Sequence, residues 1–384
     1  MKEKIYDIIV RELDGEGFPA EEFSLLKYLT ETGSVQGGDG ASPADGEFDA
    51  VMIRLPRRIK QPVFVNLHVA SRLKNGIRAQ SSLSGRLTPG QKKREDKKAA
   101  KIAAREAELA LPELSAEERA KLSKRLENIK KRAAIRKERR EERLTRRVNA
   151  AVDIAGKYEP VTVADQVISF LDTLRVKHGD IRDFGTYLCE NSCTTQAAKL
   201  GLAMLGFFGD ETSKPLVKSF CGFEEFTYFA LKTLKSITRG QDEFTEYCVT
   251  LLEKLSGWGK VAAILELPDR IDDENLRTRI LAHGAGNNIG LYITAAECAI
   301  KGGLKELMLE SEQAGEPLDK ALADGICNIF DGLFQAEKIK DADSFSEVPD
   351  MGTTIASFKE AYRNGAFDNA AEAPRIAKQL KERF

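Results

Sequence analysis

Four short segments of the sequence resemble one another: KLGLAML (residues 199–205), YFALKTL (228–234), VAAILEL (261–267) and ITAAECAI (293–300). The residues that close them follow at steps of 29, 33 and 33, at Leu205, Leu234, Leu267 and Ile300. A period of that length fits a unit of two helices joined by a short connection. Inside each segment lies a small residue that would let neighbouring helices approach closely, as the inner layer of a stack requires: Ala203, Ala230, Ala263 and Ala296.

The sequence around these segments predicts one helix after another, each bounded by Gly, Pro, Asn or Asp. The expected helices are Val163–Val176, Asp180–Asn191, Thr194–Phe208, Glu224–Ile237, Glu243–Leu255, Val261–Leu267, Asp273–His283, Gly290–Lys301 and Leu318–Phe334. We therefore expect an all-α protein whose residues 158–384 form a HEAT-like α-solenoid of stacked helix pairs. The alternative is an irregular helical bundle in which the spacing is a coincidence.

Residues 91–157 predict a charged helical hairpin, because Gln91–Leu111 and Ser115–Ala155 consist almost entirely of strong helix formers. Pro112 stops the first helix, and Ser115 with Glu118 has the capping-box spacing that starts the second. An apolar seam is expected between the two helices, formed by Leu122, Leu126, Ile129 and Ala133 on one side and Ile102 and Leu109 on the other. Over residues 136–143, RKERREER, the seam disappears, so that part should face solvent or a charged partner.

Residues 1–90 predict a small mixed region. Two short amphipathic helices are expected at Ile5–Leu13 and Glu21–Leu29, followed by a polar linker from Gly33 to Glu47. Beyond the linker, the Val-, Ile- and Phe-rich runs Ala50–Leu55 and Pro62–Val69 are long enough for the two strands of a small β-hairpin.

The net charge of -1 conceals a strong segregation along the chain. Residues 1–90 carry no net charge, residues 91–150 carry +10, and residues 151–384 carry -11. Because charge fields set partner preference region by region, the hairpin favours an anionic partner. Complementary fields would also favour an intramolecular arrangement in which the basic hairpin lies against the acidic solenoid.

A further set of residues resembles a known family pattern. Phe223–Thr227 (FEEFT), Gly257–Lys260 (GWGK) and the following AILEL, together with Asn288 and Tyr292, resemble an uncharacterised group of bacterial HEAT-type helical repeat proteins. The resemblance covers about residues 158–307 and implies a helical-repeat fold without a known activity. In that group the tryptophan motif continues into a His-Val-Glu-Arg-Leu type of run, whereas this chain has VAAILEL, so no role of that histidine or arginine carries over.

Little in the sequence points to catalysis. The three histidines, His68, His178 and His283, are widely separated and lack the spacing of metal ligands. Cys189 and Cys193 would share one helix face, where two thiols could form half of a metal site, but packing is the favoured role. Glycines 284 and 286 suit a turn between helices better than a phosphate loop, because a helix precedes them. The sequence therefore predicts no catalytic residue, cofactor or metal site, and a protein that is not an enzyme.

The remaining candidates concern binding. A dense array on the second hairpin helix could make bidentate phosphate contacts: Arg132, Arg136, Arg139, Arg140, Arg143, Arg146 and Arg147. Against this stand the interspersed glutamates Glu138, Glu141 and Glu142 and the lack of aromatic residues that could stack on bases. Trp258, the sole tryptophan, is either a wedge between repeats or an anchor for a partner.

These observations predict a scaffold or adaptor that binds a protein partner on the solenoid surface. The alternative is an RNA-, DNA- or ribosome-binding protein that uses the arginine array. The first residues alternate charged and apolar side chains, and the longest strongly apolar stretch, Leu200–Phe208, is too short for a bilayer. We therefore expect neither a signal peptide nor a membrane span, and a cytoplasmic location, which the scattered cysteines also favour.

Overall fold

The computed structural model describes residues 4–14, 18, 19, 25, 28, 67–86, 89–111, 114–157, 160–314, 316–340 and 343–384. This described part contains seventeen α-helices and three short 3-10 helices. It contains no β-strand, and its only extended pairing is a single antiparallel bridge between Leu13 and Pro19. The prediction of an all-α protein is confirmed for these residues.

The chain forms two compact units. Unit 1 comprises Met1–Tyr6 and Ser34–Phe208, and unit 2 comprises Asp7–Gly33 and Gly209–Phe384. The boundary after Phe208 lies inside residues 158–384, the segment for which the sequence predicts one solenoid. Helix α1, Ile5–Glu12, begins in unit 1, where the Ile5 N–H donates to the Ser192 carbonyl at 3.0 Å.

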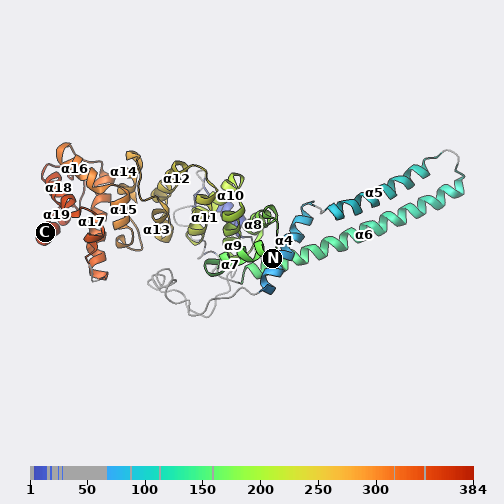
Figure 1. The fold of residues 1–384 in the computed structure, drawn as a ribbon. Coiled ribbons are helices and arrows are strands. Elements are labelled where there is room, and N and C mark those ends of the chain that lie inside the picture. Colours follow the sequence, from blue (N-terminus) through green and yellow to red (C-terminus); the bar gives the residue numbers. More distant parts are fainter. Residues whose placement is uncertain are drawn as a thin grey trace. The chain divides into compact units, whose positions relative to one another are not determined.

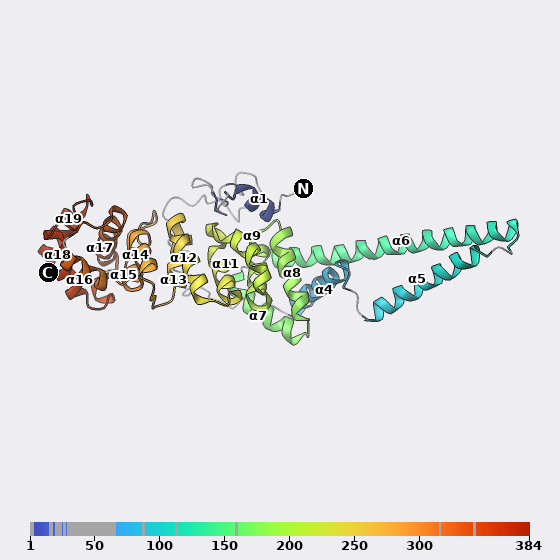
Figure 2. The ribbon, with the colours of Figure 1, turned by 90° about the horizontal axis from the view of Figure 1, so that it is seen from above.

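The described residues of unit 1 form six helices (Figure 1). They are α4 (Leu67–Leu83), α5 (Pro89–Leu109), α6 (Ala116–Ala155), α7 (Pro160–Thr173), α8 (His178–Asn191) and α9 (Thr195–Phe208), of which α5 and most of α6 extend from the others as a hairpin. The apolar core takes residues from α4, α7, α8 and α9 and from only the last two turns or so of α6, at Val148, Ala151, Ile154 and Ala155. The rest of α6 extends away from this core alongside α5 (Figure 2).

The α5–α6 hairpin has the local signals that the sequence predicts. At the start of α6, the Glu118 N–H donates to the Ser115 hydroxyl (3.3 Å) and the Ser115 N–H donates to Glu118 Oε2 (3.2 Å). The hydrogen bonds that Glu118 Oε2 accepts from the Ser115 hydroxyl (2.8 Å) and from the Ser115 N–H lower the pKa of the Glu118 carboxyl. The predicted seam is confirmed, since all six of its residues are half-buried between the two helices. Lys130 Nζ also lies 2.6 Å from Glu106 across the pair.

The predicted second strand of the N-terminal β-hairpin is wrong where it can be compared with the structure. Leu67, His68 and Val69, its last three residues, are the first turn of helix α4. The other strand and most of this one lie outside the described residues, as does nearly all of the expected helix Glu21–Leu29. Tertiary packing explains the helix: Val69, Leu73 and Ile77 recur at helical spacing and enter the unit 1 core against α6.

Unit 2 is a succession of helices (Figure 1). They are α10 (Lys214–Cys221), α11 (Glu224–Ile237), α12 (Gln241–Lys254), α13 (Gly257–Glu266), α14 (Glu274–His283), α15 (Ala295–Lys301), α16 (Leu304–Ala314), α17 (Lys320–Lys340), α18 (Met351–Arg363) and α19 (Ala373–Arg383). They follow one another in space in chain order from α11 to α15, beyond which α17 packs against α14 and α15, and α16 against α18. Helix α11 packs against α13 and α13 against α15, while α12 packs against α14. From α11 to α15, each helix therefore packs against the next helix but one along the chain.

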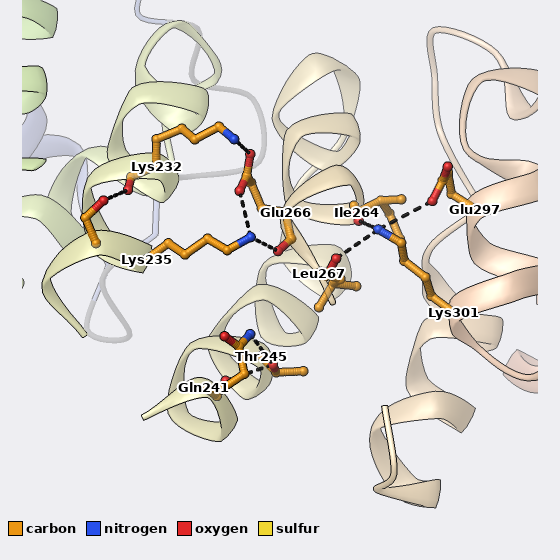
Figure 3. A network of polar contacts seen from close by, with 10 residues as sticks. Lys232, Lys235, Gln241, Thr245, Ile264, Glu266, Leu267, Glu297 and Lys301 are labelled. Carbon is orange, nitrogen blue, oxygen red and sulfur yellow. Dashed lines mark hydrogen bonds and ion pairs between the residues drawn. The ribbon is translucent and has the colours of Figure 1, made fainter. Parts of the chain in front are cut away.

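Lysines from two neighbouring helices, one of them buried, bind the carboxyl end of α13 (Figure 3). Lys301, on α15, has a side chain only 4% exposed and donates to the carbonyls of Ile264 and Leu267 at the end of α13, at 2.9 Å each. The side chain of Glu266 lies 2.6 Å from Lys232 Nζ and 3.2 Å from Lys235 Nζ on α11. Lys235 also donates to the Glu266 carbonyl at 3.2 Å. Because the last carbonyls of a helix lack donors from their own helix, Lys301 and Lys235 complete the end of α13 from both neighbours.

The start of α13 is a tight turn at Gly257, where φ is +66°. Glu224, at the start of α11, accepts a hydrogen bond from the Trp258 N–H at 2.6 Å. The side chain of Asn287 accepts from the Gly257 N–H (2.7 Å) and donates to its carbonyl (3.1 Å). A Cβ on Gly257 would lie 2.5 Å from Glu224 Oε1, so the left-handed backbone and this contact both require glycine.

Replacing Gly257 by alanine should destabilise unit 2 by about 2 to 3 kcal/mol. The left-handed backbone costs an L-residue about 1 to 2 kcal/mol, and displacing Glu224 adds about 1 kcal/mol for the weakened hydrogen bond. Urea denaturation measures the loss. Gly352→Ala is the control, because Gly352 has open space around its Cβ position and an ordinary φ, and it should not lower stability. Equal stability of the two variants would contradict the assigned role of the turn.

Lys301→Met should destabilise unit 2 by about 1 to 3 kcal/mol, because methionine fills the volume but removes the lysine donor from the buried Leu267 carbonyl and leaves the Ile264 carbonyl with only the Leu267 N–H at 3.3 Å. Thermal unfolding of the variant measures this effect. Lys381→Met, at an exposed position of α19, is the matched control and should change stability by less than about 0.5 kcal/mol. If the two substitutions have the same small effect, the lysine does not support the end of α13.

Candidate functional site

The predicted arginine array divides into distinct groups on α6. Arg132, Arg136, Arg139 and Arg143 follow one another at steps of 4, 3 and 4 residues, which places them within a sector of about 60° around the helix axis. All four are exposed. None forms an ion pair with another residue of the described chain, and Arg143 makes only a hydrogen bond to the Arg139 carbonyl. We call these four residues the arginine stripe.

The other arginines of the array have different surroundings. Arg140 points toward α5 and pairs with Glu95. Arg146 lies 3.6 Å from Glu142, one turn earlier on the same helix. Arg147 is exposed and lines a pocket near the base of the hairpin. Of the seven arginines of the array, four thus form the stripe, one braces the hairpin, one pairs within its own helix, and one lines the pocket.

The interspersed glutamates do not neutralise the stripe. At about 100° per residue, Glu138, Glu141 and Glu142 lie about 90° or more from the centre of the stripe's sector. Glu141 Oε1 lies 3.9 Å from Lys137 Nζ, and Glu142 Oε2 lies 3.6 Å from Arg146 Nη2. These glutamates therefore lie between the arginines in the linear sequence but not on the helix face that carries the stripe. The exposed face of α6 presents four guanidinium groups over about 16 Å of helix.

A pocket of about 690 Å³ lies at the base of the hairpin, within unit 1. Residues of α4, the start of α5, α6 and the turn between α7 and α8 line it. Five of them are cationic: Arg78, Arg86, Arg147, Arg175 and Lys177. Asp180 is the only acidic lining residue, and it accepts a hydrogen bond from the Ser81 hydroxyl at 2.8 Å.

Arg175 occupies an unusual backbone position. Its φ is +53°, and the Val176 N–H donates to the Leu171 carbonyl (3.1 Å) while the Arg175 N–H donates to the Asp172 carbonyl (2.8 Å). This pair of bonds is a Schellman motif that ends α7, and the left-handed residue in such a motif is most often glycine. An arginine in this conformation is a strained residue beside a pocket, which is where strain often marks function.

The sequence did not indicate this pocket. Its residues lie between positions 75 and 91, at 144 and 147, and between 175 and 180, so only the fold brings them together. Arg175 gave no local signal, because the predicted helix Val163–Val176 contains it as an ordinary helical residue. The other cations are ordinary surface residues in the linear sequence.

Trp258, the other candidate, is half-buried at the start of α13. Its backbone is fixed by Glu224 as described above. Leu265, seven residues later and therefore on the same face of α13, is 58% exposed. Tyr228 on α11 and Ile300 on α15 are also exposed on the neighbouring helices.

The histidines and cysteines have surroundings that differ from one another. Cys189 is fully buried, which raises the pKa of its thiol, whereas Cys193 is half-buried. His178 is exposed and lies 3.6 Å from Asp172. Throughout residues 4–384, as far as the structure describes them, no group of three or more His, Cys, Asp or Glu side chains is arranged to hold a metal ion.

No protein-family model matches the chain, and neither a curated protein nor a solved structure matches it. The resemblance to HEAT-type repeat proteins stays a prediction. Among the helices described, none has both the length and the apolar composition needed to cross a membrane.

Arg175→Gly should stabilise unit 1 by about 0.5 to 1 kcal/mol. Relief of the left-handed conformation contributes about 1 to 2 kcal/mol, and the greater freedom of glycine in the unfolded chain offsets about 0.5 to 1 kcal/mol of it. Differential scanning calorimetry measures the change. Arg78→Gly, inside α4, should instead cost about 1 kcal/mol. Destabilisation by Arg175→Gly would show that the arginine is needed for folding.

Proposed function

We propose that the protein is a non-enzymatic nucleic-acid-binding protein that contacts phosphates through the arginine stripe on α6. The observation that carries this proposal is the exposure of Arg132, Arg136, Arg139 and Arg143 on one helix face without ion-pair partners among the described residues. Guanidinium groups suit this role because each can donate two parallel hydrogen bonds to a phosphate.

The composition of the hairpin supports recognition of the backbone rather than of bases. Residues 89–157 contain no Phe, Tyr or Trp, so they offer no ring on which an unpaired base could stack. A row of cations with no base-reading partner favours duplex RNA or DNA bound mainly through its phosphates. We therefore expect weak sequence preference and a strong dependence of affinity on salt.

The arrangement of unit 2 supports the proposal of a HEAT-like solenoid within it. The neighbour relations of α11, α13 and α15 on one side and of α12 and α14 on the other are those of stacked helix pairs. The acidic excess of residues 151–384 makes their surface as a whole a poor partner for phosphate. We assign nucleic-acid contact to the hairpin for this reason.

A second candidate function is a scaffold that binds a protein partner on unit 2. It is favoured by apolar side chains on the solvent faces of neighbouring helices, at Tyr228, Trp258, Leu265 and Ile300. Exposed Leu and Ile with a half-buried tryptophan are the composition of many protein interfaces. The two functions are compatible, because they use different units.

Replacing Arg132, Arg136, Arg139 and Arg143 by glutamate should lower the affinity for a 20-base-pair RNA or DNA duplex more than 100-fold. Four lost phosphate contacts should also reduce the slope of log affinity against log salt by about 3 to 4, at about 0.9 per contact. Fluorescence anisotropy at several salt concentrations measures both quantities.

The matched control replaces Lys101, Lys124, Lys131 and Lys137 by glutamate, which changes the net charge equally at exposed positions outside the stripe. This variant should lose much less affinity than the stripe variant. Equal losses would mean that net charge rather than the stripe governs binding, and salt-independent binding of the unchanged protein would exclude the proposal.

Leu265→Ser combined with Ile300→Ser should leave thermal stability nearly unchanged, because both side chains are already exposed. The scaffold function predicts that this variant loses a protein captured from nuclease-treated lysate by the unchanged chain. Capture of the same protein by both forms would exclude these residues from the interface.

A further inference from the structure

We propose that the pocket at the base of the hairpin binds a phosphoryl group carried by a ligand of nucleotide size. The pocket is lined by five cationic residues and by only one acidic residue. Arg86 pairs with Asp183, and Asp180 is hydrogen-bonded to Ser81. Arg78, Arg147, Arg175 and Lys177 form no ion pair within the described residues, so four cations surround one volume.

These four cations come from three separate elements. Arg78 lies on α4, Arg147 lies on α6, and Arg175 and Lys177 lie in the turn before α8. Like charges gathered around a concave surface repel one another and raise the local concentration of anions. Helix α8 adds to this field, because it begins at the pocket and its N-cap, Lys177, supplies no side-chain cap. A dianionic phosphoryl group would relieve the repulsion.

The volume of the pocket and the apolar part of its lining favour a ligand larger than a free inorganic ion. A volume of about 690 Å³ lies in the range of pockets for small organic ligands. Ala79 and Val176 are buried, Leu144 is half-buried, and together they give the pocket an apolar surface. A phosphomonoester with an attached nucleoside has both chemistries, and the lining contains no aromatic residue that would select a base by stacking.

Two sources could supply this phosphomonoester. One is a free nucleotide, and the other is the 5′-phosphate of a nucleic acid, which rests on the proposed function. The second source fits the position of the pocket, because Arg147 lies one helical turn after Arg143, the last residue of the arginine stripe. A duplex on the stripe would then end in the pocket.

The test uses the full chain and calorimetric titration with adenosine 5′-monophosphate, adenosine and inorganic phosphate. We expect adenosine 5′-monophosphate to bind at least tenfold more tightly than adenosine and more tightly than inorganic phosphate. Arg78→Gln and Arg175→Gly should each weaken its binding at least tenfold. Because Arg175→Gly relieves a strained backbone, loss of binding in that variant cannot be ascribed to misfolding.

Arg72→Gln is the control, because Arg72 is an exposed cation on α4 that does not line the pocket. It should leave binding unchanged. The source is identified with a duplex carrying either a 5′-phosphate or a 5′-hydroxyl. A gain in affinity from the 5′-phosphate that disappears in Arg175→Gly supports the nucleic-acid end, whereas mononucleotide binding without such a gain supports the free nucleotide.

The proposal is overturned if neither adenosine 5′-monophosphate nor the 5′-phosphate binds, or if Arg72→Gln weakens binding as much as Arg78→Gln does. The failure of the duplex proposal would look different. The variant with glutamate at the four stripe positions should still bind adenosine 5′-monophosphate, because none of those residues lines the pocket. Nucleotide binding without duplex binding would therefore remove the proposed function and leave the pocket assigned.

Discussion

The anchoring of the carboxyl end of α6 in unit 1 is the constraint on which the candidate site depends. Val148, Ala151, Ile154 and Ala155 are buried there, and α4 approaches them so closely that a Cβ on Gly76 would overlap the side chain of Ala151. The preceding part of α6 has no fully buried residue. A helix of this length with so polar a surface is stable because its end is fixed, its start is capped and its residues favour helix.

The same anchoring explains how like charges can persist on one helix face. Arginines one turn apart repel each other and weaken a helix slightly, and the stripe contains such neighbours in succession. Cross-helix pairs such as Lys130 with Glu106 and the half-buried seam offset this repulsion on the other face. The charges that remain are available to an anionic ligand. The pocket repeats this situation, since four of its five cations form no ion pair within the described residues.

Unit 2 contains buried lysines that donate hydrogen bonds to backbone carbonyls at helix ends. Its helices are short, so a large share of their carbonyl groups lies near a terminus, where donors from the same helix are absent. Lys301 donates to two carbonyls at the end of α13, and Lys260 donates to those of His283 and Gly286, at 2.9 and 2.7 Å. Burial lowers the pKa of Lys260, which is the expected effect of low polarity on a cation. Lys301 thereby connects α15 to α13, the next helix but one, and Lys260 connects α13 to the end of α14.

The sequence by itself determined what depends on neighbours along the chain. Helical composition, the Ser115 cap, the apolar seam and the helix at Glu224–Ile237 were all predicted from local spacing and are present in the structure. Only the tertiary structure decided the rest. A Val- and Phe-containing run that suits a strand, Pro62–Val69, ends in helix α4 because the unit 1 core takes the apolar face of that helix. Only the arrangement of side chains around α6 separates the arginine stripe from the nearby glutamates. The pocket forms only because three segments that are distant in the sequence meet in unit 1. Such contacts depend on the packing of the whole unit, which no local pattern specifies.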